Sequence, residues 1–439
     1  TITPAKLKSE YDLRGVLKAE QILNGTTEYL KTEYTHDFLD NILTVKDDKA
    51  RDNNKPFTVK YEYDYAGRTV KETDIEGNFK TTAYDAAGRK TSETDYMGTA
   101  VNYFYDAAGR LVKTTAPVDD TQTSEQKTYY DANGNAVKTL TAAGATDWRA
   151  TATEYDVMNR PTAVKTYPQT VTGPDLTGLA YDLTASYTYN SMGSVLTQGG
   201  ASSMTYEYNG LNQVTKMTDP ENKSETYEYN LLGLPTKKTD RKGIVTTYAY
   251  NVWKNPTSIV ASLGSQTQSV TYTYVILGNR KSMTDNTGTT TYNYDFLSRL
   301  TTESHNGTIK TYEWDKYGNK TGLDVNAPDA VTYDANYTYN LRNQMSGMTG
   351  GCGLLTSSYS YDANGRVSSK TLNGITTNYT YNQSNAVTEL ETEKTADGSH
   401  LFSAVYGFER SGNIVTDSSL GVNAFVEKTY IYDGKNRLK

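Results

Sequence analysis

The side chains most able to perform acid–base chemistry are three histidines, His36, His305 and His400. A catalytic or metal-binding histidine needs a suitable partner at a suitable spacing, such as a second histidine or a carboxylate. The three lie far apart in the sequence, and no His-x-x-x-His or His-Glu pair accompanies them. We therefore assign all three to surface or turn positions.

The single cysteine, Cys352, lies in the glycine-rich segment Thr-Gly-Gly-Cys-Gly-Leu. A reactive thiol needs a neighbouring base or a helix N-terminus that lowers its pKa, and this segment offers neither. One cysteine also excludes an internal disulfide framework and a cysteine-rich metal site. Nucleophilic catalysis by Cys352 is not predicted.

The acidic segment 47–54, Asp-Asp-Lys-Ala-Arg-Asp-Asn-Asn, carries oxygen ligands of the kind that Ca²⁺ prefers. A solvated polar loop explains the same residues, and we favour that interpretation. The sequence therefore predicts no catalytic residue, no metal site and no cofactor, and we expect the chain not to be an enzyme.

Tyrosine dominates the aromatic residues, with 39 Tyr against 8 Phe and 3 Trp. Rows of exposed tyrosines beside Asn, Asp and Arg could stack against sugar rings, so surface glycans are one candidate ligand. Packing of the same rings between repeats is the alternative. We favour packing because the spacing of the tyrosines is regular.

The formal net charge of −7 is spread along the chain without a basic cluster, so no nucleic-acid partner is expected. No stretch approaches 18 apolar residues, so no membrane span is predicted. The chain opens on Thr-Ile-Thr-Pro, with neither an initial Met nor a signal-peptide pattern. We expect it to be part of a longer protein.

The elements that must position these residues are repeats of Tyr-Asp-x-x-Gly-Arg or a close variant, which return every 19 to 27 residues along nearly the whole chain. Four copies are almost unaltered, and degenerate copies follow anchors such as Tyr155, Tyr229 and Trp314. The anchor residues of the four best copies are Tyr63, Asp64, Gly67 and Arg68; Tyr84, Asp85, Gly88 and Arg89; Tyr105, Asp106, Gly109 and Arg110; and Tyr361, Asp362, Gly365 and Arg366.

A Tyr-x-Tyr pair such as Tyr103 and Tyr105 precedes most of the motifs, and residues two apart lie on one face of a strand. The motif then forms a turn, and a second strand returns. The last turn position needs positive φ, which explains why Gly there is replaced mostly by Asn, as at Asn159 and Asn212. Each repeat is therefore a β-hairpin.

Successive hairpins joined by second turns predict one continuous antiparallel ribbon. About 38 strands at roughly 4.8 Å spacing give about 180 Å of ribbon. That length suits one turn of a wide shell about 60 Å across, or several turns of a narrow solenoid. Three longer segments, 117–127, 166–186 and 391–403, are predicted to protrude as loops and to carry partner contacts.

The copies at 84–89, 105–110 and 361–366 closely resemble the YD repeat of bacterial RHS-repeat proteins, Tc-toxin shell subunits and teneurins. The resemblance covers residues 60–439, about 17 repeats, and extends more loosely over 1–59 as degenerate YD-like repeats. It implies an all-β fold in which tandem hairpins form a spiral ribbon, part of a hollow β-shell. The chain is expected to stop before any core or C-terminal toxin domain.

The resemblance implies a non-enzymatic wall segment of a secreted or surface-exposed bacterial protein. Its expected partner is an encapsulated toxin or effector segment of the same or a companion chain. The aspartyl-protease activity of some relatives is not expected, because Asp219-Pro220 lies in an ordinary turn between repeats. An extracellular adhesin or a filament formed by self-assembly is the alternative. Arg68, Arg89, Arg110 and Arg366 are expected to brace neighbouring hairpins against the turn aspartates.

Overall fold

The computed structural model describes residues 4–200, 202–328, 332–351, 355–421 and 424–438. Within them the chain is almost entirely β-structure: 37 strands form one sheet, and a single short helix, α1 (Asp48–Asp52), interrupts it. Every strand pairs antiparallel with the next strand in the sequence, from β1–β2 to β36–β37. The predicted all-β hairpin ribbon is confirmed.

The strands of the first half of the ribbon are β1 (Lys6–Tyr11), β2 (Leu17–Asn24), β3 (Thr27–His36), β4 (Ile42–Lys46), β5 (Val59–Tyr63), β6 (Thr69–Asp74), β7 (Phe79–Tyr84), β8 (Lys90–Thr94), β9 (Ala100–Tyr105), β10 (Leu111–Pro117), β11 (Thr123–Tyr130), β12 (Ala136–Ala142), β13 (Trp148–Tyr155), β14 (Pro161–Thr166), β15 (Asp182–Tyr189), β16 (Val195–Gly199), β17 (Ser203–Tyr208), β18 (Val214–Thr218) and β19 (Ser224–Tyr229).

Those of the second half are β20 (Pro235–Thr239), β21 (Val245–Tyr250), β22 (Pro256–Leu263), β23 (Gln266–Tyr274), β24 (Arg280–Asp285), β25 (Gly288–Tyr294), β26 (Leu300–His305), β27 (Thr308–Trp314), β28 (Lys320–Asn326), β29 (Thr332–Tyr339), β30 (Met345–Gly350), β31 (Leu355–Tyr361), β32 (Val367–Leu372), β33 (Ile375–Tyr381), β34 (Val387–Lys394), β35 (His400–Phe408), β36 (Ile414–Gly421) and β37 (Phe425–Thr429).

Two kinds of turn alternate along the ribbon. The turns that hold the YD motif, here called YD turns, follow odd-numbered strands, and the inter-hairpin turns follow even-numbered strands. The two kinds therefore lie on opposite edges of the ribbon. A register shift adjoins the anchor tyrosine of the YD turns, as between Ala83 and Tyr84, where a residue of the returning strand is left out of the pairing.

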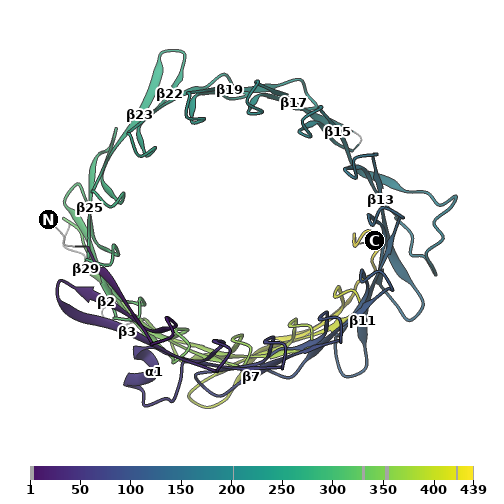
Figure 1. Ribbon diagram of the computed structural model, residues 1–439, viewed down its shortest axis with the longest axis horizontal. Coiled ribbons are helices and arrows are strands. Elements are labelled where there is room, and N and C mark those ends of the chain that lie inside the picture. Colours follow the sequence, from purple (N-terminus) through teal and green to yellow (C-terminus); the bar gives the residue numbers. More distant parts are fainter. Residues whose placement is uncertain (1–3, 201, 329–331, 352–354, 422–423, 439) are drawn as a thin grey trace.

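The ribbon curves into a ring around an open centre and then overlaps its own beginning (Figure 1). The turn after β8 contacts the turn after β31, and the turn after β10 contacts the turn after β33, so one circuit takes 23 strands. We call one circuit a wind. At about 4.8 Å per strand a wind holds roughly 110 Å of ribbon, which corresponds to a ring about 35 Å or more across. The ring is thus wide, but narrower than the 60 Å expected for a single non-overlapping turn.

The predicted burial of the tyrosines is only partly correct, since the anchor rings are half-buried. The buried hydrophobic cluster consists of Leu140, Ala150, Tyr167, Val171 and Leu176. It forms where the segment after β14 folds back on β12 and β13, joined by an isolated bridge between Trp148 and Val171. A curved single-layer wall has room for contacts between neighbouring hairpins and little room for a central core.

The three predicted protruding loops are shorter than expected. Strand pairing continues into 123–127 and 400–403 and up to residue 394, leaving connections of 118–122, 167–181 and 395–399. The 167–181 segment carries three residues of the buried cluster, so it is not a purely solvated loop. Polar Thr and Glu residues extend these strands because a ribbon needs backbone pairing more than it needs apolar side chains.

Candidate functional site

Each well-preserved YD turn is closed by its own Asp and Arg, as residues 64–68 show. The Gly67 amide donates to the Asp64 carbonyl and the Asp64 amide to the Arg68 carbonyl, both at 3.0 Å. Asp64 Oδ1 accepts the amides of Ala66 and Arg68, and Oδ2 accepts Arg68 Nε at 2.7 Å. The hydrogen bond from the Arg68 side chain, followed by that from its amide, holds the pKa of Asp64 below its ordinary value.

The predicted positive φ at the last turn position is confirmed. Gly67 has φ 75°, Asn159 has 60° and Asn212 has 62°. Two further turns place residues there that the sequence did not single out, Lys254 at 67° and Ser298 at 65°. The surrounding turn hydrogen bonds are the same in both cases, so the motif geometry is imposed even on side chains that disfavour it.

The anchor tyrosines join each hairpin to the one before it. Tyr105 donates its hydroxyl to the Lys90 carbonyl at 2.8 Å, and Tyr229 donates to the Val214 carbonyl at 2.7 Å. In each case the acceptor is the first residue of the preceding hairpin's return strand. The same contact recurs from Tyr63, Tyr84, Tyr130, Tyr155, Tyr189, Tyr208, Tyr250, Tyr274, Tyr294, Tyr339, Tyr361 and Tyr381, and from the Trp314 ring nitrogen.

The motif arginines reach in the opposite direction, toward the next hairpin. The Arg68 guanidinium lies 4.6 Å from the centre of the Tyr84 ring, and Nη1 donates to the Asp85 carbonyl at 3.4 Å. Arg89 and Arg110 repeat both contacts, and Arg366 stacks on Tyr381 at 4.4 Å. Each arginine therefore pairs with the aspartate of its own turn, and it contacts the next hairpin through a ring and a carbonyl instead of a carboxylate.

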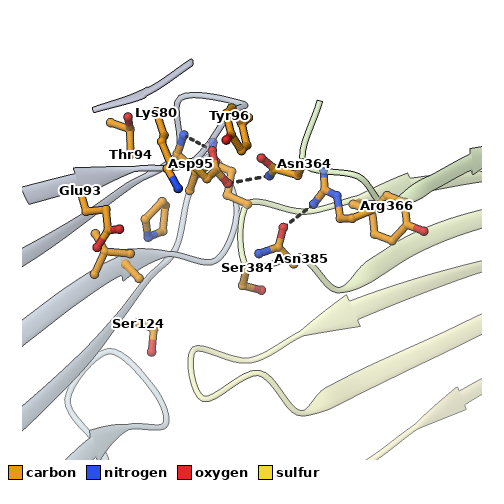
Figure 2. Close-up of a pocket in the computed structure, with 16 residues that line it drawn as sticks. Lys80, Glu93, Thr94, Asp95, Tyr96, Ser124, Asn364, Arg366, Ser384 and Asn385 are labelled. Carbon is orange, nitrogen blue, oxygen red and sulfur yellow. Dashed lines mark hydrogen bonds between the residues drawn. The ribbon is translucent and has the colours of Figure 1, made fainter. Parts of the chain in front are cut away.

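The sixteen anchor residues predicted from the sequence fall into two groups in space. The copies at 63–68, 84–89 and 105–110 are consecutive hairpins of the first wind. The copy at 361–366 belongs to the second wind, and its Asn364 donates to Asp95 Oδ2 at 2.7 Å, between the hairpins of Tyr84 and Tyr105 (Figure 2). The overlap of the ribbon thus brings the fourth copy to an inter-hairpin turn, on the edge opposite the YD turns of the other three copies.

A seam joins the two winds, with YD turns of the second wind on inter-hairpin turns of the first. Arg342 Nη2 lies 2.7 Å from Asp74 Oδ2. Gln383 donates to Asp120 Oδ1 at 2.9 Å across 263 residues, and Arg149 pairs with Glu409 at 2.7 Å across 260 residues. Lys435 pairs with Asp182 near the end of the chain.

The seam residues were missed by the sequence analysis. Most occupy the two middle positions of a YD turn, which differ from copy to copy and so carry no repeat signal. What these residues share becomes visible only once the structure shows which turn of the first wind each of them faces. Lys316, Tyr317, Arg342, Asn364, Gln383 and Lys435 are donors, and each meets an aspartate of the first wind.

A groove of about 830 Å³ runs along this seam between Tyr96, Asp95 and Lys80 on one wind and Arg366, Asn385 and Ser384 on the other (Figure 2). Burial and the hydrogen bond to Glu72 raise the pKa of Tyr96 to about 12. Its hydroxyl donates to Glu72 within the first wind, and its ring faces Arg342 of the second wind.

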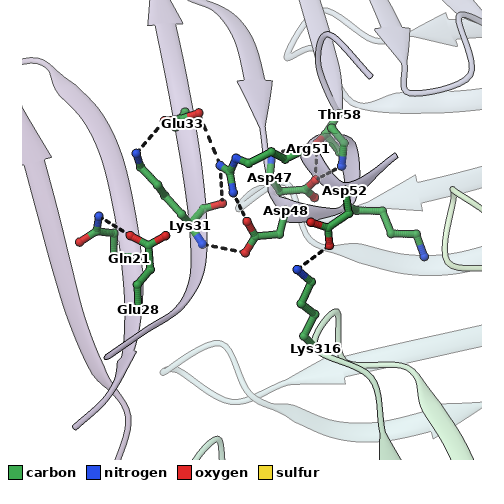
Figure 3. Close-up of polar contacts among 12 residues, drawn as sticks. Gln21, Glu28, Lys31, Glu33, Asp47, Asp48, Arg51, Asp52, Thr58 and Lys316 are labelled. Atoms are coloured by element: carbon green, nitrogen blue, oxygen red, sulfur yellow. Dashed lines mark hydrogen bonds and ion pairs between the residues drawn. The ribbon is translucent and has the colours of Figure 1, made fainter. Parts of the chain in front are cut away.

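The acidic segment 47–54 forms a helix and its cap, not the predicted solvated loop (Figure 3). Asp47 caps α1 by accepting the Ala50 amide at 3.0 Å, and Asp48 is buried, where it accepts the Lys31 amide and pairs with Arg51. Asp52 contacts Lys316 and Tyr317 of the second wind. The oxygen atoms suggested as Ca²⁺ ligands are thus used in protein contacts.

The histidines were predicted at surface or turn positions; they lie at strand ends, not in turns, and each is partly exposed. His36 ends β3 at an anchor position, and His305 ends β26, where Nδ1 lies 3.0 Å from Thr290 Oγ1. His400 begins β35. All three are half-buried and far from one another along the ribbon.

Cys352 lies outside the described residues. No group of three or more His, Cys, Asp or Glu in the described ranges could hold a metal ion, and no helix there is long and apolar enough to span a membrane.

Comparison with known proteins finds one matching family model and several solved structures with a similar fold. Residues 83–275 match the family model described as Teneurin YD-shell. No curated protein sequence matches the chain. The crystal structure of TcdB2-TccC3-Cdc42 superposes with a TM-score of 0.67 at 15% identity, covering 97% of this chain and 25% of that one. The crystal structure of TcdB2-TccC3 gives 0.64 at 16%, covering 94% and 28%. The Tc holotoxin pore of Photorhabdus luminescens gives 0.64 at 16%, covering 94% and 27%.

The family-model match and the solved structures support the resemblance to the RHS/YD-repeat family that the motifs predict, and the fold of this chain is that of a YD shell. It spans about a quarter of the length of the solved structures that it matches.

Proposed function

We propose that this chain is a non-enzymatic wall segment of a secreted or cell-surface shell that encloses a toxin or effector polypeptide. The observation that carries the proposal is the constant offset of 23 strands between contacting turns, which makes the ribbon overlap itself in register around an open centre. A wall built in this way separates an inside from an outside.

The pairing of the ribbon supports a barrier role. Strand-to-strand hydrogen bonds run without interruption from β1 to β37 in the described residues, and the tyrosine hydroxyls and arginines add a second set of links between hairpins. An enclosed polypeptide meets few free backbone groups on such a wall, so it has little opportunity to add itself as a strand. The sixteen anchor residues, in this proposal, serve the wall mechanically.

The cargo is proposed to be a segment of the same or a companion chain. The solved structures that this chain resembles are those of TcdB2 together with TccC3. At 15–16% identity the likeness extends to the fold, so the cargo of this protein has to be identified experimentally. No specific contact among the described residues favours the adhesin or filament alternative.

Limited proteolysis of the purified full-length gene product, with any co-purifying chain, tests the proposal. We expect mass spectrometry to find a contiguous segment outside residues 1–439 that resists protease until the wall is unfolded with denaturant. Equal cleavage of all segments outside the wall, before and after unfolding, would refute encapsulation. Long fibres in the same preparation would favour the filament alternative.

A further inference from the structure

The YD edge of the first wind carries a row of exposed apolar side chains. In six consecutive YD turns the middle positions hold Val157, Met192, Leu211, Leu231, Trp253 and Ile276, whose exposed fractions range from 59% to 101%. We call these six residues the tip row. Neighbouring hairpins are two strands, or about 10 Å, apart, so the tip row forms a stripe about 50 Å long. A continuous apolar stripe of this length marks an interaction surface.

The established seam shows what contacts a YD edge. Wherever the second wind overlaps the first, its YD turns lie on inter-hairpin turns that come earlier in the chain, as Arg342 lies on Asp74. The tip row is on the same edge of the ribbon, but in the described residues no earlier ribbon lies beneath it. By continuity with the seam, its partner is ribbon that precedes β1 in the spiral.

The chemistry of the tip row differs from that of the seam. The seam places donors such as Arg342 and Asn364 on aspartates, whereas the tip row presents apolar side chains. Two free inter-hairpin turns of this chain, Asp219–Lys223 and Asp240–Ile244, are polar. A second copy that placed these two turns on the tip row would bury apolar tips against charged side chains, which is unfavourable.

A groove of about 610 Å³ between the turns of Trp253 and Ile276 offers a seat for an apolar side chain of an opposing turn.

We infer that the tip row is the docking surface for a further wind of β-hairpin ribbon on the same polypeptide, one that leads into β1 and whose inter-hairpin turns carry apolar side chains. The inference goes beyond the proposed function because it concerns how the wall is assembled and requires no cargo. The apolar tips would also fix the order of the winds, since they match apolar turns and reject the acidic turns of the seam.

Site-specific photo-crosslinking of the full-length gene product tests this inference. A benzophenone amino acid is introduced at Leu231 or Trp253, which are exposed, so the substitution leaves the hairpins intact. Gln383, which contacts Asp120, is the positive control, and Phe104, which lies within β9 and not in a turn, is the negative control. We expect intramolecular adducts from positions 231 and 253 to a hairpin turn encoded before residue 1, at a yield several-fold above that from position 104.

Adducts to a second copy, to a separate chain or to a protected cargo segment would overturn the inference, and so would a yield no higher than that of position 104. These outcomes are independent of the proteolysis result, because a wall can enclose a cargo whichever ribbon covers the tip row.

Discussion

Arg342 Nη2 lies 2.7 Å from Asp74 Oδ2, and both side chains are almost buried, with 14% and 11% of their surfaces exposed. This ion pair joins a YD turn of the second wind to an inter-hairpin turn of the first. Arg342 also lies 5.2 Å from the centre of the Tyr96 ring. Arg342 therefore contacts the first wind in two ways, through the Asp74 carboxylate and through the Tyr96 ring.

Replacing Arg342 with Met should open the seam at this point. The change leaves the Asp74 carboxylate without its cation in a poorly solvated place, which we expect to cost about 2–4 kcal/mol. Urea denaturation followed by tyrosine fluorescence measures the effect. The matched control is Lys223→Met, because Lys223 and Glu221 form an exposed pair that should contribute less than about 1 kcal/mol. Equal effects of the two substitutions would contradict the role of the seam.

The tyrosine contacts between hairpins predict a modest loss from deleting one hydroxyl. Tyr250 donates to the Pro235 carbonyl at 2.7 Å, so Tyr250→Phe should lower the free energy of unfolding by about 1 kcal/mol. Tyr65→Phe should have no effect, because Tyr65 is fully exposed at a turn. A Tyr250→Phe variant as stable as the parent in urea would show that the hydroxyls do not hold the hairpins together.

The positive φ of the YD turn predicts a position-specific intolerance of Cβ. Gly193 has φ 88° and free space around it, so Gly193→Ala tests backbone strain without a steric clash. We expect a loss of about 1–2 kcal/mol in denaturant unfolding. Gly210→Ala is the control in the next hairpin, where φ is not positive and the space is also open. Equal unfolding midpoints of the two alanine variants in denaturant would contradict this interpretation.

Alkaline pH should weaken the wall. Burial first, and then the hydrogen bond to Glu72, raises the pKa of Tyr96 from its ordinary value of 10.0 to about 12. Burial also raises the pKa of Tyr229 and Tyr274. A folded-state pKa above the unfolded value stabilises the protein below about pH 10, and this stabilisation is lost as the pH rises through 12.

Absorbance of tyrosinate measures this effect directly. The folded protein should titrate at higher pH than the denatured protein, and the urea midpoint should fall between pH 10 and 12. Tyr96→Phe should reduce that fall. Coincident titration of the folded and unfolded chains would contradict the burial of the rings.

The local unit of this fold could be predicted from sequence because its geometry is encoded in each copy. The Tyr-x-Tyr spacing determines the strand face, and Gly or Asn reports the positive φ at positions such as 67 and 159. Lys254 and Ser298 escaped prediction because their side chains do not reveal the backbone angle that the turn imposes. Strand ends were misplaced at 123–127 and 400–403, where pairing with the neighbouring strand overrides polar composition.

Strand spacing and composition left the curvature open, and only the family resemblance favoured a hollow shell; the seam was not predicted at all. The contact between Asn364 and Asp95 joins residues 269 apart, and it depends on the accumulated twist of 23 strands. Small changes in twist per strand would bring another turn under Asn364. The helix α1 escaped for a related reason, because its burial depends on Lys31 and on contacts with the second wind.

Electron cryo-microscopy of the full-length gene product is the most direct measurement of the central claim. The account predicts a hollow particle whose wall is a single layer of strands, with successive winds offset by 23 strands over residues 1–439. A continuous fibre, or a solid particle in which the ribbon folds flat on itself, would contradict it.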